Sequence, residues 1–190
     1  MNIFTAKRFH QLVFWLSFAP LGYLIVLTLR DDLGANPVQH LIQFSGTWSL
    51  NFLLATLAMS PLVKMTGNKI WFGLLKLFGL WMFFFALLHA LVYVGIDHAF
   101  DWQEILHDLF NHVYLMLGLA ALVLSLPLGV TSNEWLKAKL GGLWKKLHKL
   151  IYVIAVLAAM HYWLAVKLDI SSPFLYCAML MLLLLFRFLP

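Results

Sequence analysis

Long apolar runs separated by short polar stretches dominate this chain. Each run is close to the about 20 residues that one helix needs to cross a bilayer. There are six of them, at residues 9–29, 46–63, 74–96, 111–130, 148–168 and 173–189. The pattern therefore predicts an all-α membrane protein, with a single transmembrane domain over residues 1–190 folded as a six-helix bundle.

The first apolar run follows Lys7 and Arg8, as in a signal peptide. Its 21 residues exceed the about 7–15 apolar residues of a signal peptide core, so we interpret it as a helix of the mature protein. Composition supports a bilayer environment for the whole chain. Hydrophobic residues make up 63% and charged residues 11%, whereas a soluble domain has about 25% charged residues.

The charges at the two ends of the predicted helices differ in sign. Eleven of the 13 lysines and arginines lie on one side, and only Arg30 and Lys167 lie on the other. The acids are distributed in the opposite way, with Glu134 alone on the basic side. Because Lys and Arg accumulate in cytoplasmic loops, both termini are predicted to be cytoplasmic. The net charge of +5 thus reflects topology and contact with anionic lipids, and does not indicate nucleic-acid binding.

The sequence lacks the cysteines and the short motifs that several kinds of redox or catalytic site require. The single cysteine, Cys177, rules out intramolecular disulfides and four-cysteine clusters. The sequence contains no dinucleotide-binding G-x-G-x-x-G, no Walker loop and no nucleophile elbow. Any electrons would therefore come from another protein or from a lipid-soluble carrier.

Two histidines lie at matching depths inside predicted helices. An ionisable ring is costly in hydrocarbon, so an intramembrane histidine is a candidate functional residue. His89 and His161 each lie seven residues, about 10 Å, from the outer ends of two helices that run in the same direction. Two such rings can hold a haem between neighbouring helices of a bundle. The alternative for each is a structural histidine that is hydrogen-bonded within the bundle.

A third histidine, His148, lies 13 residues before His161 and so about 20 Å nearer the cytoplasm. This separation suits a second haem. At about 100° per residue, however, the two rings lie roughly 140° apart around the helix axis, and the third span offers Leu75 and Lys76 at that depth, not a histidine. The alternative is an interfacial histidine that pairs with a lipid headgroup, a haem propionate or a flavin phosphate.

The other histidines are interpreted from their positions in the loops. His112 opens the fourth span on the outer side, where it could face haem propionates. The remaining four are expected to be solvated: His10, His40, His98 and His107. The aromatic run from Trp81 to Phe85 is expected to pack inside the bundle.

The stretch from Leu140 to Tyr152 (LGGLWKKLHKLIY), followed by His161, Tyr162 and Trp163, resembles the MsrQ family, also called YedZ. These proteins are haem-binding membrane subunits of the bacterial periplasmic protein-methionine-sulfoxide reductase system. The resemblance extends over essentially the whole chain. Its other matches are residues 33–37, 44–46, 52–57 and 128–132, and residues 76–81 leading to His89 and Tyr93.

The resemblance implies a ferric-reductase-like six-helix bundle with b-type haem in the bacterial inner membrane. It implies electron transfer from a cytosolic flavin reductase or the quinone pool to a periplasmic molybdopterin enzyme that reduces methionine sulfoxide, and an association with FMN. On this sequence it makes His89 and His161 the ligands of the outer haem and His148 a candidate inner ligand. One haem or two are therefore expected.

The sequence departs from the family pattern in two places. A usual Arg-Arg pair is Leu75-Lys76 here, which leaves one cation fewer for a propionate or a flavin phosphate. A usual Arg-Pro-Tyr is His112-Val113-Tyr114, which replaces a permanent charge by one that titrates near neutrality.

The prediction is a haem b subunit that carries electrons and performs no substrate chemistry by itself. Two axial imidazoles leave no open position on iron, which favours electron transfer over oxygenase chemistry. Two alternatives remain at this point. One is a quinol-oxidising or ferric-reducing cytochrome b, and the other is a non-redox transporter or assembly factor whose histidines serve a proton or metal path.

Overall fold

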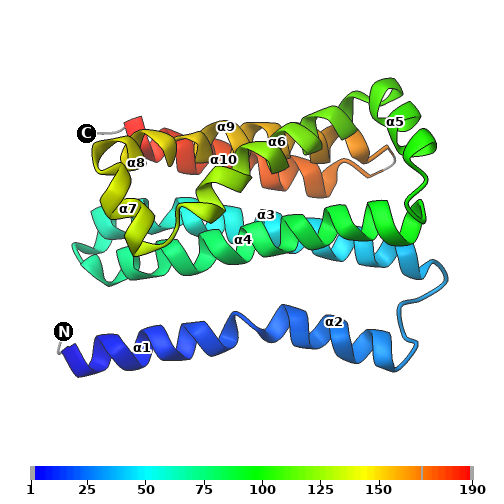
Figure 1. The fold of residues 1–190 in the computed structure, drawn as a ribbon. Helices are drawn as coiled ribbons and strands as arrows, with labels where there is room; N and C mark the ends of the chain where they lie inside the picture. Colours follow the sequence, from blue (N-terminus) through cyan, green and yellow to red (C-terminus); the bar gives the residue numbers. More distant parts are fainter. Residues whose placement is uncertain (1–2, 168, 189–190) are drawn as a thin grey trace. The chain divides into compact units, whose positions relative to one another are not determined.

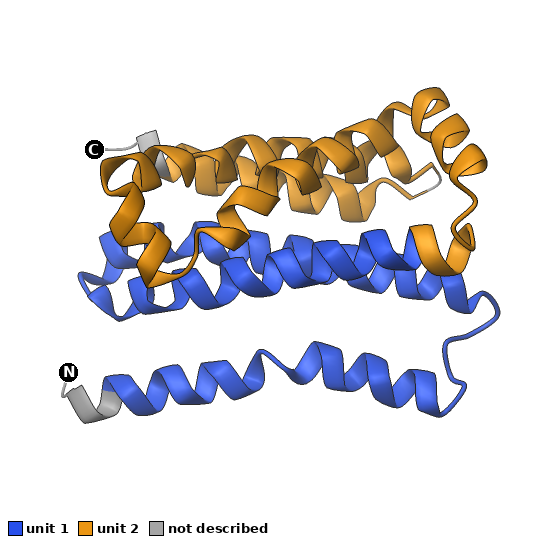
Figure 2. Ribbon diagram, in the orientation of Figure 1, with its two compact units in different colours: residues 1–93 blue, residues 94–190 orange. Residues whose placement is uncertain are grey.

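The computed structural model describes residues 3–167 and 169–188, whose regular structure is entirely helical (Figure 1). Two compact units divide the chain, at residues 1–93 and 94–190 (Figure 2). Unit 1 contains α1 (Ile3–Leu16), α2 (Ala19–Leu29), α3 (Pro37–Thr66), the 3-10 helix η1 (Lys69–Leu74) and α4 (Leu75–Leu91). A π-helical segment, η2 (Val92–Asp97), follows. Unit 2 contains α5 (Trp102–Asn111), α6 (Val113–Val130), α7 (Glu134–Leu140), α8 (Gly142–Leu147), α9 (Leu150–Ala165) and α10 (Ser171–Phe188).

Five helical segments within the described residues are long and apolar enough to cross a membrane. They are Ala6–Leu29, Pro37–Thr66, Lys69–Asp97, Val113–Val130 and Gly142–Ala165. The sixth predicted span corresponds to a shorter apolar helix, Ser171–Phe186. The prediction of an all-helical protein with several membrane spans is confirmed, whereas the count of six and the cytoplasmic termini stay predictions.

Unit 1 begins with two helices where one was predicted over residues 9–29. α1 ends at Leu16 and α2 starts at Ala19 with Pro20 in its first turn. Proline has no N–H to donate and clashes with the preceding turn of a helix, so it is tolerated at a helix start but not in the interior. The proline therefore accounts for a new helix start inside this apolar run.

Aromatic packing forms the centre of unit 1, where α3 lies along α4. The ring of Phe52 on α3 stacks on Trp81 and on Phe85 of α4, with centroid distances of 5.8 Å in both pairs. Phe85 is fully buried, and Phe18 from the α1–α2 connection meets Trp81 edge-on at 4.8 Å. The expectation that the run from Trp81 to Phe85 packs inside the bundle is confirmed for Trp81 and Phe85 and is wrong for Phe84, which is 40% exposed.

Unit 2 is built on α6 and α9, which pack along each other around a core of Ala121, Leu128 and Ile154. The inner loop contains two helices that the apolar pattern did not predict, α7 and α8. α7 begins at the cap Asn133, whose side chain accepts a hydrogen bond from the N–H of Leu136. Trp144 of α8 donates its indole N–H to the carbonyl of Thr131 at 2.9 Å, which ties α8 to the end of α6.

The fifth predicted span is interrupted near its inner end. α8 ends at Leu147 and α9 begins at Leu150, so His148 lies in the turn between them. The angle of roughly 140° predicted between the rings of His148 and His161 assumed one continuous helix. The turn at His148 and Lys149 interrupts that helix, and the angle between the two rings stays a prediction.

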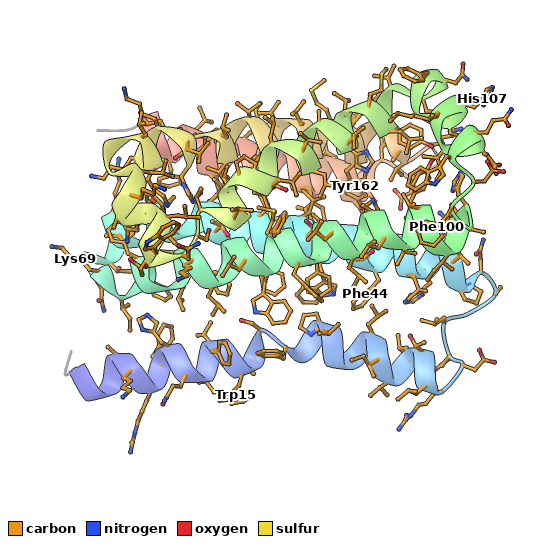
Figure 3. All side chains as sticks on the ribbon, in the orientation of Figure 1. Trp15, Phe44, Lys69, Phe100, His107 and Tyr162 are labelled. Atoms are coloured by element: carbon orange, nitrogen blue, oxygen red, sulfur yellow. The ribbon has the colours of Figure 1, made fainter. Side chains whose placement is uncertain are left out.

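Apolar side chains also cover the outside of the helices, as lipid contact requires. Trp15 points away from the other helices of unit 1 on α1 (Figure 3) and is 69% exposed, and Leu29 on α2 is 81% exposed. In unit 2, Val123 of α6 is 51% exposed. Polar caps lie at the helix ends instead. One is Asp169, which accepts from Ser171 at 3.0 Å, and the hydrogen bonds from Ser171 hold the pKa of this carboxyl below its usual value.

Candidate functional site

His89 lies in the last turn of α4 and is fixed against α3 within unit 1. Its Nδ1 lies 2.9 Å from the carbonyl oxygen of Ile42. Because a carbonyl can only accept, Nδ1 carries the proton of this bond. The same edge of the ring lies against Gly46, where a Cβ atom would come within 3.1 Å of Nδ1. The backbone of α3 therefore sets both the tautomer and the position of this imidazole.

His161 is held in the same way within unit 2. Its Nδ1 on α9 donates to the carbonyl oxygen of Tyr114 on α6 at 2.7 Å. A Cβ atom at Gly118 would lie 2.8 Å from the same nitrogen. In both units the histidine follows its carbonyl partner by 47 residues, and the glycine lies four residues after that carbonyl.

This arrangement prepares both imidazoles for a metal. With the proton on Nδ1, the lone pair is on Nε2, the usual ligand atom for haem iron. A carbonyl partner at Nδ1 fixes the orientation of a ligating imidazole and raises its basicity. The donor set in each unit therefore fits one axial ligand of a haem. Among the described residues no group of three or more His, Cys, Asp or Glu could hold a bare metal ion.

His148 has a partly satisfied ring. Its Nδ1 donates to the carbonyl of Trp144 at 3.1 Å, and the ring stacks on the Trp144 indole with 3.9 Å between centroids. Its Nε2 is buried and makes no hydrogen bond of ordinary geometry to the described residues, although the backbone of Leu128 lies beside the ring. A buried polar atom without a partner is costly and needs an explanation. This atom is consistent with a group that binds there.

Two further predicted site residues lie near these histidines in the chain. Lys76, in the first turn of α4, is exposed and precedes His89 by 13 residues, the same spacing that separates His148 from His161. His112 caps the start of α6, with its Nδ1 3.0 Å from the carbonyl of Asp108. Its ring lies 5.5 Å from that of Tyr114, the residue whose carbonyl holds His161.

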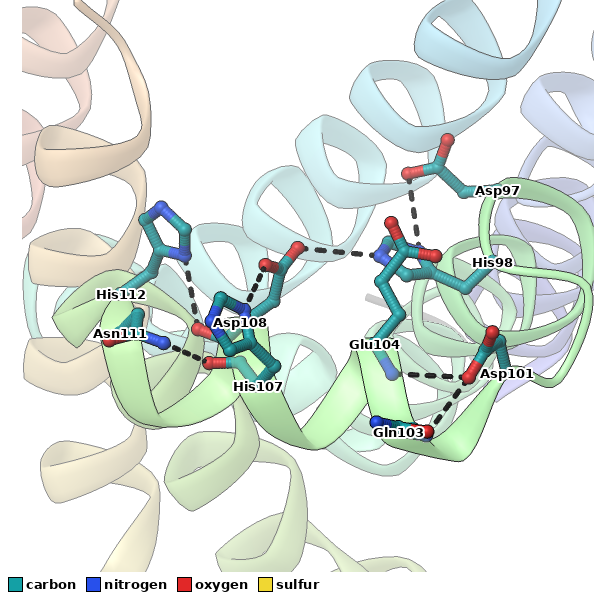
Figure 4. Close-up of polar contacts among 9 residues, drawn as sticks. All are labelled: Asp97, His98, Asp101, Gln103, Glu104, His107, Asp108, Asn111 and His112. Carbon is teal, nitrogen blue, oxygen red and sulfur yellow. Dashed lines mark hydrogen bonds and ion pairs between the residues drawn. The ribbon is translucent and has the colours of Figure 1, made fainter.

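The outer loop of unit 2 corrects one expectation about the solvated histidines (Figure 4). The side chain of His98 is only 9% exposed and lies between two carboxylates, 3.6 Å from Asp97 and 3.4 Å from Asp108. It was expected to be solvated, and that is wrong, because the ring is enclosed by Asp108 on α5 and by Asp97 at the end of η2. His107 on the opposite side of Asp108 is 74% exposed, as expected.

The other two histidines expected to be solvated are half-buried in unit 1. His10 places its Nε2 2.9 Å from the carbonyl of Ile70 and packs against Gly73. His40 stacks on Phe44 with 6.2 Å between ring centroids. Neither is fully in solvent, because both face neighbouring aromatic or backbone groups.

Comparison of the sequence with known proteins shows which family the chain belongs to. Residues 45–159 match the family described as the ferric reductase like transmembrane component. A protein from Rhodospirillum rubrum is 40% identical over 94% of this chain and 86% of its own length. Relatives from Herminiimonas arsenicoxydans and Bordetella pertussis are 38% and 39% identical over 93% and 95% of this chain, and 83% and 88% of their own lengths. Each of the three is named as the haem-binding subunit MsrQ of protein-methionine-sulfoxide reductase.

The chain belongs to the MsrQ family. The predicted resemblance is thereby confirmed. Sequence reasoning had nevertheless missed the backbone partners of the two histidines in this MsrQ-family chain. One signal could have found them, since Gly46 and Gly118 are 72 residues apart, as are His89 and His161.

Proposed function

We propose that this chain is a haem b electron-transfer subunit of the bacterial inner membrane, with His89 and His161 as the two axial ligands of an outer haem. The supporting observation is the matched arrangement of the two histidines, each with Nδ1–H on a backbone carbonyl and its Nδ1 edge against a glycine. The relatives named as haem-binding subunits point to the same cofactor. The matching depths of the two residues in the sequence add an independent argument.

The haem supplies one-electron redox chemistry, and the chain tunes it. His89 and His161 would hold the iron between them, and a haem held by two imidazoles would carry electrons without binding oxygen or a substrate. The carbonyls of Ile42 and Tyr114 keep each imidazole in one tautomer and increase its electron donation to iron. The chain thus acts within an oxidoreductase system without performing substrate chemistry by itself.

We propose that His148 holds a second group through Nε2, either the iron of a second, inner haem or an acidic group of a cofactor. Its buried Nε2 supports binding of some group, since Nδ1 is already committed to Trp144. Lys76 is the cation proposed for a haem propionate or for the phosphate of FMN on the inner side. His112 is proposed to face the propionates of the outer haem, because it adjoins Tyr114.

We propose a cytosolic flavin reductase or the quinone pool as the electron donor and a periplasmic molybdopterin methionine-sulfoxide reductase as the acceptor. The relatives' names support the acceptor, since they describe subunits of a protein-methionine-sulfoxide reductase. The basic inner side and acidic outer side of the predicted six-span topology support this direction of transfer. Mixing the oxidised protein with a reduced quinol, or with flavin reductase and NADH, distinguishes the donors.

The visible spectrum of the purified protein tests the proposed cofactor. We expect the dithionite-reduced minus oxidised spectrum in detergent to be that of a b-type haem, with at least about one haem per chain by pyridine haemochrome. A protein that stays colourless after expression with ample haem would overturn the proposal. That outcome would favour a non-redox transporter or assembly factor.

Replacing His148 by alanine decides the role of the inner histidine. If His148 ligates a second iron, haem content falls from about two to about one per chain, because one axial ligand is lost. The spectrum of the remaining haem stays that of the outer site. A content of about one haem per chain in both the unmodified protein and His148→Ala would show that His148 does not ligate iron. The matched control is His107→Ala, which removes an exposed ring from the same unit.

A further inference from the structure

Gly46 and Gly118 each lie directly against the imidazole of a candidate haem ligand. A Cβ atom at Gly46 would meet Nδ1 and Cε1 of His89, both at 3.1 Å. At Gly118 it would meet the same two atoms of His161, at 2.8 and 2.9 Å. By contrast, Gly79 in α4 and Gly142 in α8 have no neighbouring atom within 4 Å of this position. The space at the first two glycines is filled by an imidazole.

The glycines and the carbonyl partners form one structural feature. In an α-helix the carbonyl of residue i already accepts the N–H of residue i+4. Side chains point back toward the N-terminus, so the side chain at i+4 covers the turn that bears this carbonyl. A small donor can reach such an oxygen beside alanine, as the Ser49 hydroxyl reaches Met82, but a glycine at i+4 leaves room for the broad edge of an imidazole. The pairs Ile42 with Gly46 and Tyr114 with Gly118 have this spacing.

A third glycine shows that the choice of nitrogen matters. Gly73 also adjoins a histidine, His10, with Cε1 and Nε2 at 2.5 Å from a Cβ position. There the carbonyl of Ile70 is contacted by Nε2 instead of Nδ1. A proton on Nε2 removes the lone pair from the nitrogen that ligates haem iron. The close contact at Gly73 therefore serves packing, whereas the contacts at Gly46 and Gly118 orient Nε2.

We propose that Gly46 and Gly118 are positioning residues for the haem. Each glycine lets the Nδ1 edge of the imidazole approach the helix backbone. This approach would fix the rotation of the ring about the bond from Nε2 to iron. It also fixes the length, and so the strength, of the hydrogen bond from Nδ1–H to the carbonyl. Both properties tune the redox potential of a bis-histidine haem. This inference rests on the proposed function, since it assigns a role toward the same cofactor.

Alanine substitutions at the two glycines test the proposal. We expect Gly118→Ala to weaken haem retention about tenfold and to shift the low-spin electron paramagnetic resonance signal and the midpoint potential of the haem that remains. Gly46→Ala should act in the same direction but less, because its contact is longer, at 3.1 Å against 2.8 Å. The controls Gly79→Ala and Gly142→Ala should leave all three properties unchanged. A Gly118→Ala protein with the signal and potential of the controls would overturn the proposal.

A second measurement separates positioning from a general folding defect. In the haem-free protein, Gly118→Ala should lower the midpoint of thermal unfolding when His161 is present, and much less in the His161→Ala background, where the clashing ring is absent. An equal loss in both backgrounds would overturn the proposal. If the unmodified protein binds no haem, the proposed function fails, while this comparison still reports whether glycine and imidazole are coupled.

Discussion

We expect that replacement of His161 by alanine abolishes binding of the proposed outer haem, and that replacement of His89 does the same. Each change removes one of the two proposed ligand nitrogens, and the carbonyls of Tyr114 and Ile42 cannot replace an imidazole as a ligand. The expected result is a detergent-purified protein whose reduced spectrum lacks the low-spin b-type signal of this site. The measurement is the reduced minus oxidised spectrum, together with haem per chain.

Added imidazole should restore the haem signal in a variant that lacks the histidine side chain. Replacing His161 by glycine leaves a space of imidazole size beside Gly118, so free imidazole added during purification should restore part of the low-spin signal. Restoration shows that the ligand, and not the fold, was lost. The control is His107→Ala, whose ring is 74% exposed and should not affect the spectrum. An unchanged reduced spectrum in both His89→Ala and His161→Ala would sink the assignment.

Phe85→Ala has the largest expected effect on stability. Phe85 is fully buried and stacks on Phe52. The ring centroids of Trp81 and Phe84 lie 5.9 and 5.4 Å from that of Phe85. Truncating a buried phenylalanine leaves a cavity and removes dispersion contacts, which typically costs about 3 kcal/mol or more. Dispersion is the relevant contribution here, because lipid chains are as apolar as the ring itself.

The measurement is the free energy of unfolding in mixed detergent micelles, compared with Phe72→Ala. Phe72 is 46% exposed in η1, so its loss should cost much less. Because Phe85 lies one turn before His89 on α4, haem retention should fall together with stability. Equal unfolding free energies for the two variants would show that the aromatic stack does not stabilise unit 1.

Much of the architecture could be predicted from local properties of the chain. The length and apolarity of a run decide whether it can cross a bilayer, and neither depends on distant residues. Five of the six predicted spans correspond to helices that meet these criteria, although the first is broken between Leu16 and Ala19. The helices in the polar loops, α5, α7 and α8, were missed because they are short and lack an apolar run of spanning length.

Some properties of the histidines could be predicted from the sequence, and others depend on the fold. His89 and His161 stand out in the sequence because an ionisable ring inside an apolar run is unusual. The partly enclosed position of His98 could not be predicted, because it depends on Asp108, ten residues away on a helix that the apolar pattern did not indicate.

The sequence by itself determined that this protein belongs in a bilayer and that it is helical. It also determined the candidate haem ligands and the family resemblance. Each of these depends on composition, run length or a contiguous motif. Only the tertiary structure decided how the two imidazoles are held, because the acceptors Ile42 and Tyr114 lie 47 residues before the histidines in the chain. A backbone carbonyl has no side-chain signature, and the glycine that exposes it acquires a role only when the neighbouring helix packs against it.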